Sequence, residues 1–112
     1  MRVTYNKLVR DRIPELIEAN GHHAVTRILD GQDYRAALLA KLIEEAQEAQ
    51  GAPTDELPSE LADVWEVLRA LLSTVPMTWQ GFQALAASKR GERGGFSERI
   101  FLEYTEQADH AP

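Results

Sequence analysis

The sequence predicts an all-α protein, a helical bundle built around an antiparallel helix hairpin. Residues 33–51 combine high helix propensity with an N-cap candidate, Asp33, and a glycine stop at Gly51. Residues 59–75 repeat apolar side chains at helical spacing. The linker GAPTDELP between them holds two prolines, so we expect the second helix to turn back along the first.

Two further helices are expected, one on each side of this hairpin. Pro14 suits the first turn of a short helix over about 12–20, which Asn20-Gly21 would end. Thr78 can cap a helix over about 78–90, before a glycine-rich break. With only one obvious hairpin in the chain, a four-helix core would need a second subunit.

A short two-stranded β ribbon is a further expectation. The β-branched stretch 24–29 precedes Asp30-Gly31, which is typical of a strand that ends in a turn. It could pair with the extended segment RIFLEY, residues 99–104. A lone ribbon is marginal in water, so this one would have to pack on helices or on another subunit.

Length and composition place limits on the class of protein. With 112 residues, of which 44% are hydrophobic, residues 1–112 fit one domain. The chain has no cysteine, which excludes disulfides and thiolate metal sites and fits a reducing compartment. No apolar run approaches the roughly 20 residues of a membrane span, and the N-terminus lacks a signal-peptide core. We therefore expect a cytoplasmic protein with no membrane partner.

The charge distribution is uneven along the chain. The net charge of −6 argues against a nucleic-acid partner, because affinity for a phosphate backbone comes mainly from basic surface. Residues 44–66 hold eight acids and no lysine or arginine, whereas residues 2–12 hold four basic residues. Acidic side chains thus gather in the centre of the sequence and basic ones toward both ends.

The two central helices carry the spaced carboxylates Glu44-Glu45-x-x-Glu48 and Glu60-x-x-Asp63. With about 100° per residue, and with Leu39 and Leu61 as centres of the apolar stripes, both sets start at the same-handed edge. In an antiparallel pair these edges meet, so Glu45, Glu48, Glu60 and Asp63 would converge. The alternative is that all of them are solvated charges, as in most acidic helices. Against it, these acids lack basic partners at i+4.

Four converging carboxylates would repel one another unless a cation neutralised them. Ligands that offer only oxygen favour magnesium, manganese or calcium over zinc. Magnesium binds a few carboxylates together with substrate phosphates, so a cationic clamp should complete the site. Its candidates are the basic residues near the two ends, although any one of them could serve solubility alone: Lys7, Arg10, Lys89 and Arg93.

These residues resemble the EExxE and ExxD motif of the MazG-like nucleotide pyrophosphohydrolases. The opening YNKLVRDRIPELIEANG and the closing KRGERGGFSERIFL look like the ends of a phosphoribosyl-ATP pyrophosphohydrolase-like branch of that superfamily. The resemblance covers nearly the whole chain. It implies an all-α fold, a homodimer or homotetramer, and a site between helices.

The resemblance also implies roles for particular residues. Glu45, Glu48, Glu60 and Asp63 take the positions of magnesium ligands, with manganese as a substitute ion. Glu44 takes a supporting role and Lys89 and Arg93 the triphosphate-binding positions. Catalytic roles fall on Glu44, Glu45 and Glu48, with a glutamate as base for the water that attacks the α-phosphorus.

The expected function is magnesium-dependent hydrolysis of a nucleoside triphosphate to the monophosphate and pyrophosphate, as in house-cleaning enzymes. Two alternatives stay open at this point. One is phosphoribosyl-ATP hydrolysis, since no residue here names the base or the sugar. The other is a helical module that binds a nucleotide or a partner without turnover.

Overall fold

The computed structural model describes residues 1–107, and within that range it contains four helices and no strand. They are α1 (Ile13–Ala19), α2 (Gly31–Gly51), α3 (Leu57–Leu72) and α4 (Trp79–Arg93). The chain divides into two units, Met1–Met77 and a second that starts at Thr78. The all-α prediction is confirmed. The prediction of one domain over 1–112 includes residues 108–112, which lie outside the described part, and it stays a prediction.

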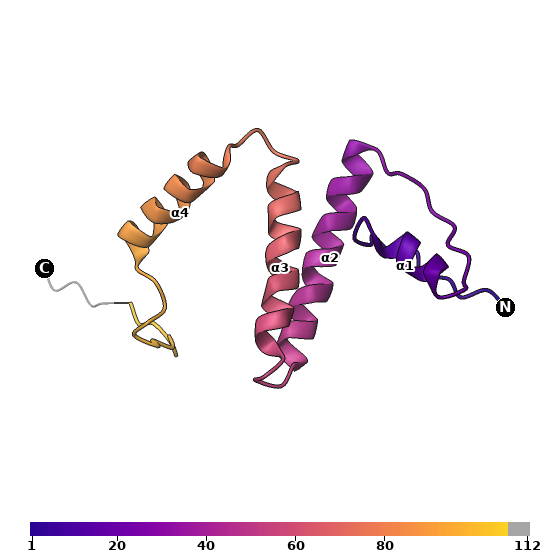
Figure 1. The fold of residues 1–112 in the computed structure, drawn as a ribbon. Coiled ribbons are helices and arrows are strands. Elements are labelled where there is room, and N and C mark those ends of the chain that lie inside the picture. Colours follow the sequence, from indigo (N-terminus) through magenta and orange to yellow (C-terminus); the bar gives the residue numbers. More distant parts are fainter. Residues whose placement is uncertain (108–112) are drawn as a thin grey trace, which may run out of the picture. The chain divides into compact units, whose positions relative to one another are not determined.

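Helices α2 and α3 lie side by side and form the centre of the first unit (Figure 1). Five residues, 52–56, join them. Pro53 organises this short loop, because its carbonyl accepts hydrogen bonds from the amides of Glu56 and Leu57, both at 3.0 Å. Pro58 then occupies the first turn of α3, where its missing N–H costs nothing.

The start of α2 differs from the sequence prediction. Asp30, not Asp33, is the N-cap: its Oδ1 accepts a hydrogen bond from the amide of Asp33 at 2.8 Å. The helix therefore begins three residues earlier, at Gly31, because Asp30 has the extended backbone that a cap requires. Asp33 lies in the first turn, where its negative charge suits the helix dipole.

The contact between α2 and α3 is centred one residue away from the predicted stripe on α2. The buried residues of the described chain are Leu38 and Glu45 on α2 and Val67 on α3. Leu39 and Leu61, taken from the sequence as stripe centres, are about half exposed at 48% and 52%. The physical reason is that each helix has apolar side chains over a wide arc, and only one edge of that arc is used here.

A second connection joins the ends of α2 and α3 that lie away from the loop. Arg35, in the first two turns of α2, donates from Nε to Oγ1 of Thr74 at 3.1 Å and from its terminal nitrogen to the Thr74 carbonyl. Thr74 follows the last turn of α3, and its hydroxyl bonds the carbonyl of Leu71 at 2.7 Å. The two helices are thus held at both ends.

The N-terminal segment reaches α1 without regular structure. Residue Asn6 has a φ of 45°, a left-handed conformation that asparagine tolerates better than most residues. The carbonyl of Arg10 accepts from the amide of Ile13 at 3.0 Å, and this bond fixes the backbone of Arg10 to the start of α1. Helix α1 confirms the predicted helix over about 12–20.

The second unit contains α4. Thr78 caps it as predicted, with Oγ1 accepting from the amide of Gly81 at 3.0 Å. The helix continues past the predicted end at residue 90 as far as Arg93, and Gly94, with a φ of 80°, then ends it. Glycine meets that positive φ without the steric penalty of a side chain.

The predicted β ribbon is wrong. Neither 24–29 nor 99–104 forms a strand in the described chain. Apolar side chains of both segments are exposed, with Ile28 at 96% and Phe101 at 87%, so no packed face stabilises a ribbon that is marginal by itself. Within the described residues, the model has no helix with the length and apolar character that a bilayer crossing requires.

Candidate metal centre

Three carboxylates from α2 and α3 meet in the first unit. Glu45, Glu60 and Asp63 each offer one oxygen, and these oxygens lie within 4.8 Å of one another. Glu45 lies on α2, six residues before its end, and Glu60 and Asp63 are one turn apart near the start of α3. The short loop sets this register, because it brings the end of α2 next to the beginning of α3.

Burial distinguishes this cluster from ordinary surface acids. Glu45 is only 7% exposed, and it shares the buried interface with Leu38 and Val67. Oε2 of Glu45 and Oε2 of Glu60 are both buried, and neither has a hydrogen-bond partner in the described chain. A buried carboxylate oxygen without a partner is costly, so a bound ligand that paired with these oxygens would relieve that cost.

The cluster alters the ionisation of Glu60. Desolvation raises the pKa of Glu60 above its ordinary value, and repulsion from Glu48, Asp63 and Glu45 raises it further. A hydrogen bond with Glu48 acts in the same direction, because it favours the protonated form. Glu60 therefore responds to three neighbouring carboxylates, of which Glu48 has the largest effect.

Glu48 and Glu44 lie at the edge of the cluster. Glu48 is exposed, outside the group of three oxygens, but close enough to act on Glu60. Glu44 is half-buried and forms ion pairs with Lys7 at 3.7 Å and Lys41 at 3.8 Å. Of the four predicted metal ligands, the structure thus brings three together directly and places the fourth beside them.

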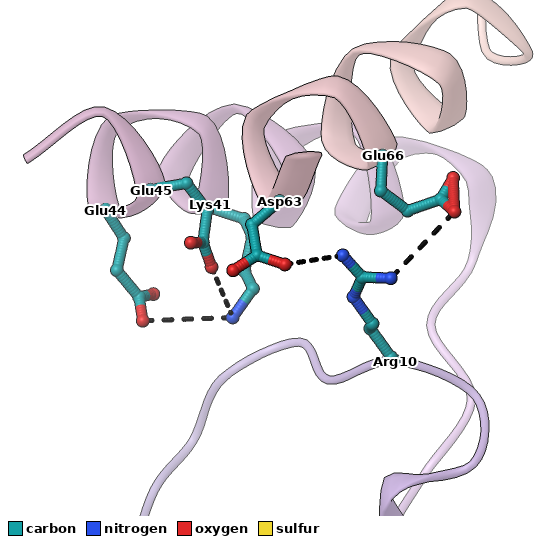
Figure 2. A network of polar contacts seen from close by, with 6 residues as sticks. All are labelled: Arg10, Lys41, Glu44, Glu45, Asp63 and Glu66. Carbon is teal, nitrogen blue, oxygen red and sulfur yellow. Dashed lines mark hydrogen bonds and ion pairs between the residues drawn. The ribbon is translucent and has the colours of Figure 1, made fainter. Parts of the chain in front are cut away.

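Basic side chains contact the cluster from two directions (Figure 2). Arg10, from the N-terminal segment, donates to Oδ1 of Asp63 at 2.7 Å and lies 4.0 Å from Glu66. Lys41, on α2 itself, lies 3.5 Å from Oε1 of Glu45. Lys7 and Arg10 were expected to bind phosphate, and here both pair with carboxylates instead.

Sequence reasoning missed two members of this network, Lys41 and Glu66. Both could have been found from spacing alone. Lys41 lies four residues before Glu45, which is pairing distance on a helix, and Glu66 lies three residues after Asp63. Lys41 precedes Glu45 in the chain, whereas basic partners were expected four residues after each acid.

The donor set fits a hard divalent cation. All available ligand atoms are carboxylate oxygens, which magnesium, manganese and calcium prefer. The buried Oε2 atoms of Glu45 and Glu60 accept no hydrogen bond from the described chain, so they are available as ligands for a cation. Glu45, Glu60 and Asp63 would hold the ion, with Glu48 next to them.

The other two expected phosphate-binding residues belong to the second unit. Lys89 and Arg93 lie on the second half of α4, and both are exposed. They are one helical turn apart, so they share a face of α4. Arg93 directly precedes Gly94, where the helix ends.

Comparison with known proteins gives a partial match. No family model matches the chain, and no solved structure matches it. An uncharacterized protein of Mycolicibacterium smegmatis (strain ATCC 700084 / mc(2)155) is 56% identical over 48 residues, which cover 43% of this chain. The matched stretch spans about half, 49%, of the length of that relative.

Proposed function

We propose that this protein hydrolyses a nucleoside triphosphate between the α and β phosphates, in the manner of the MazG-like pyrophosphohydrolases that it resembles. The observation that carries the proposal is the buried Glu45, whose unpartnered Oε2 lies beside the carboxylates of Glu60 and Asp63. Buried carboxylate oxygens without a hydrogen-bond partner reduce stability, so a role in binding gives a physical reason for them.

In this proposal magnesium, or manganese in its place, supplies charge neutralisation and polarises the phosphate oxygens. Glu45, Glu60 and Asp63 hold the ion. Exposed Glu48 or half-buried Glu44, both at the edge of the cluster, would accept a proton from water. Lys7 and Arg10, in the first unit, are the proposed contacts to the remaining phosphates. For Lys89 and Arg93, in the second unit, a role in phosphate binding rests on the resemblance alone.

The proposed site requires α2 and α3 to run antiparallel. Two contacts support this arrangement. The loop 52–56 joins the end of α2 to the start of α3, and Arg35 near the start of α2 bonds Thr74 after the end of α3. In that arrangement Glu45 and Asp63 lie level, as do Glu48 and Glu60.

We also propose that two copies associate through the apolar row that α2 and α3 leave exposed. Taking Leu38 and Val67 as reference, this row lies about 100° to 160° round each helix in one sense, and Glu44 and Glu48 lie in the opposite sense. A second copy could therefore cover it without blocking the acids. Its members are Leu39 (48% exposed), Ile43 (61%), Leu61 (52%) and Trp65 (47%).

Pyrophosphate release tests the proposed reaction. Purified protein is incubated with ribo-, deoxyribo- and damaged nucleoside triphosphates, and with phosphoribosyl-ATP, with and without magnesium. At least one substrate should release pyrophosphate only when the metal is present. Glu45→Gln keeps the shape of the side chain but removes its charge, and it should lower kcat/KM by roughly 100-fold or more.

Glu56→Gln is the matched control, because Glu56 is an exposed acid just before α3 and outside the cluster. It should retain the wild-type rate. If no triphosphate releases pyrophosphate, or if Glu45→Gln is as active as Glu56→Gln, the proposed hydrolysis is wrong. In the first case, the binding of a nucleotide without turnover would identify a non-catalytic module.

A further inference from the structure

Arg10 makes the shortest contact to the carboxylate cluster. Its guanidinium donates to Oδ1 of Asp63 at 2.7 Å, and its other terminal nitrogen lies 4.0 Å from Oε1 of Glu66 (Figure 2). Asp63 is one of the three residues whose oxygens converge within 4.8 Å. One of the three convergent acids is therefore already bound by a cation that belongs to the chain.

The charge balance around the cluster explains why a cation is held there. Among the described residues, six carboxylates face three basic side chains. The acids are Glu44, Glu45, Glu48, Glu60, Asp63 and Glu66, and the basic residues are Lys7, Arg10 and Lys41. The acids are in excess even with Arg10 present, so removal of Arg10 leaves a stronger attraction for any other cation.

Arg10 and Lys41 differ in their freedom to leave. Lys41 belongs to α2, four residues from its partner Glu45, and its side chain is only 17% exposed. Arg10 belongs to the irregular N-terminal segment, and its side chain is 53% exposed. The guanidinium of Arg10 can therefore leave Asp63 and Glu66 and enter water without disturbing either helix. The side chain of Lys41 is mostly buried, so its ammonium cannot reach water as easily.

The N-terminal segment depends on these side-chain contacts for its position. Its polar contacts with α2 and α3 are the ion pairs of Lys7 with Glu44 and of Arg10 with Asp63 and Glu66. Leu8 and Val9, between Lys7 and Arg10, are half-buried. No backbone hydrogen bond links residues 1–9 to the described helices. A change in the charge of the cluster therefore acts directly on what holds this segment.

We propose that Arg10 takes the place of a divalent cation in the metal-free protein, and that metal binding displaces it from Asp63. Both cations neutralise the same carboxylate, so they compete. The displaced guanidinium then stays next to the site, on the N-terminal segment that metal binding has released, and can contact a phosphate. This inference rests on the proposed function for the identity of the ligand, but the competition itself concerns metal and protein alone.

Mn²⁺ binding without nucleotide tests the competition. Free Mn²⁺ is followed by electron paramagnetic resonance during titration of the wild type, Arg10→Gln and Arg10→Lys. Arg10→Gln should bind Mn²⁺ several-fold more tightly than the wild type. The affinity of Arg10→Lys should fall between the two, because lysine keeps the positive charge but lacks the planar set of N–H donors of the guanidinium. Arg12→Gln is the control, since Arg12 pairs only with Glu15 at 2.6 Å in the described chain, and its affinity should be unchanged.

Limited trypsin digestion separates displacement from a general charge effect. In the wild type, cleavage after Lys7 should be faster when Mn²⁺ saturates the protein, because the segment is released. In Arg10→Gln this cleavage should be fast already without metal, and Mn²⁺ should change its rate little. Circular dichroism of each variant checks that the helices are retained.

The outcomes distinguish this inference from the function on which it rests. Equal or weaker Mn²⁺ binding by Arg10→Gln, or an unchanged rate of cleavage after Lys7 in the metal-saturated wild type, overturns displacement and leaves the hydrolase proposal standing. Absence of Mn²⁺ binding in every variant overturns both. Tighter binding together with faster cleavage supports displacement, whether or not pyrophosphate is released.

Discussion

At the scale of single residues, acids occupy positions that apolar side chains would stabilise better. Glu45 is buried, as Leu38 and Val67 are, at the contact of α2 with α3, where a hydrophobic residue of similar size would add packing and avoid desolvation. The sequence predicted that Glu45 would lie at the edge of the apolar stripe on its helix. It could not show that Arg10, 53 residues from Asp63 in the chain, would reach the cluster, because long-range ion pairs leave no spacing pattern.

The raised pKa of Glu60 predicts how the stability of the metal-free protein depends on pH. The folded state holds the Glu60 proton more tightly than the unfolded state, so this group contributes stability below its ordinary pKa. That contribution is lost as the pH rises through the raised pKa. Thermal unfolding in the presence of a chelator should therefore show a melting temperature that falls over this interval.

Glu60→Gln removes the titration and supplies the comparison. Its melting temperature should fall less than that of the wild type over the same pH interval, so the difference between the two should grow as the pH rises. Added magnesium should reverse the loss in the wild type only. A constant difference between the two proteins at every pH would show that Glu60 does not carry this dependence.

At the scale of elements, sequence patterns located all four helices but misjudged which edge of α2 is buried. Thr78 and Pro14 gave direct signals at helix starts. The stripe centre was misplaced because Leu38 and Leu39 are adjacent, and both belong to a broad apolar arc. Composition alone cannot decide which part of such an arc meets a neighbour, since that depends on the partner helix. The ribbon failed for a related reason: strand propensity at 24–29 has no sheet to join.

The cap of α2 gives a prediction at this scale. Asp30→Ala removes the acceptor of the Asp33 amide and should lower the free energy of unfolding by about 1 kcal/mol in urea denaturation. Asp30→Asn retains an oxygen acceptor and should lose less. Both variants should bind Mn²⁺ like the wild type, because Asp30 lies about 22 Å along α2 from Glu45. A larger loss of unfolding free energy for Asp30→Asn than for Asp30→Ala would contradict the assigned cap.

At the scale of the whole molecule, the described chain buries few side chains for its length. Leu38 and Val67 are its buried apolar residues, whereas the row Leu39, Ile43, Leu61 and Trp65 is about half exposed. The sequence predicted that one hairpin would need a second subunit to complete a core, and the exposed row is the surface where we propose that it binds. The division after Met77 was not predicted, because Pro76 followed by a capping Thr78 has the same pattern as an ordinary turn between packed helices.

A substitution that places one positive charge in this row tests whether two copies associate through it. Ile43→Lys places an ammonium group on a side chain that is 61% exposed in a single chain, so the isolated fold should tolerate it. Analytical ultracentrifugation at micromolar concentration should find a dimer or tetramer for the wild type and a monomer for Ile43→Lys. Val25→Lys, at an 88% exposed position outside the helices, should assemble like the wild type. A monomeric wild type, or an associated Ile43→Lys, would exclude this interface.

The bonds from Arg35 to Thr74 have a consequence for the choice of ion. These hydrogen bonds at one end of the α2–α3 pair and the loop 52–56 at the other fix the distance between the two helix backbones, and so between Glu45 on α2 and Glu60 and Asp63 on α3. Carboxylate oxygens on two helices at a fixed spacing adjust less readily to the radius of a bound ion. Magnesium and calcium differ in radius and in the geometry they accept, so at the proposed metal site this fixed helix spacing would discriminate between the two ions.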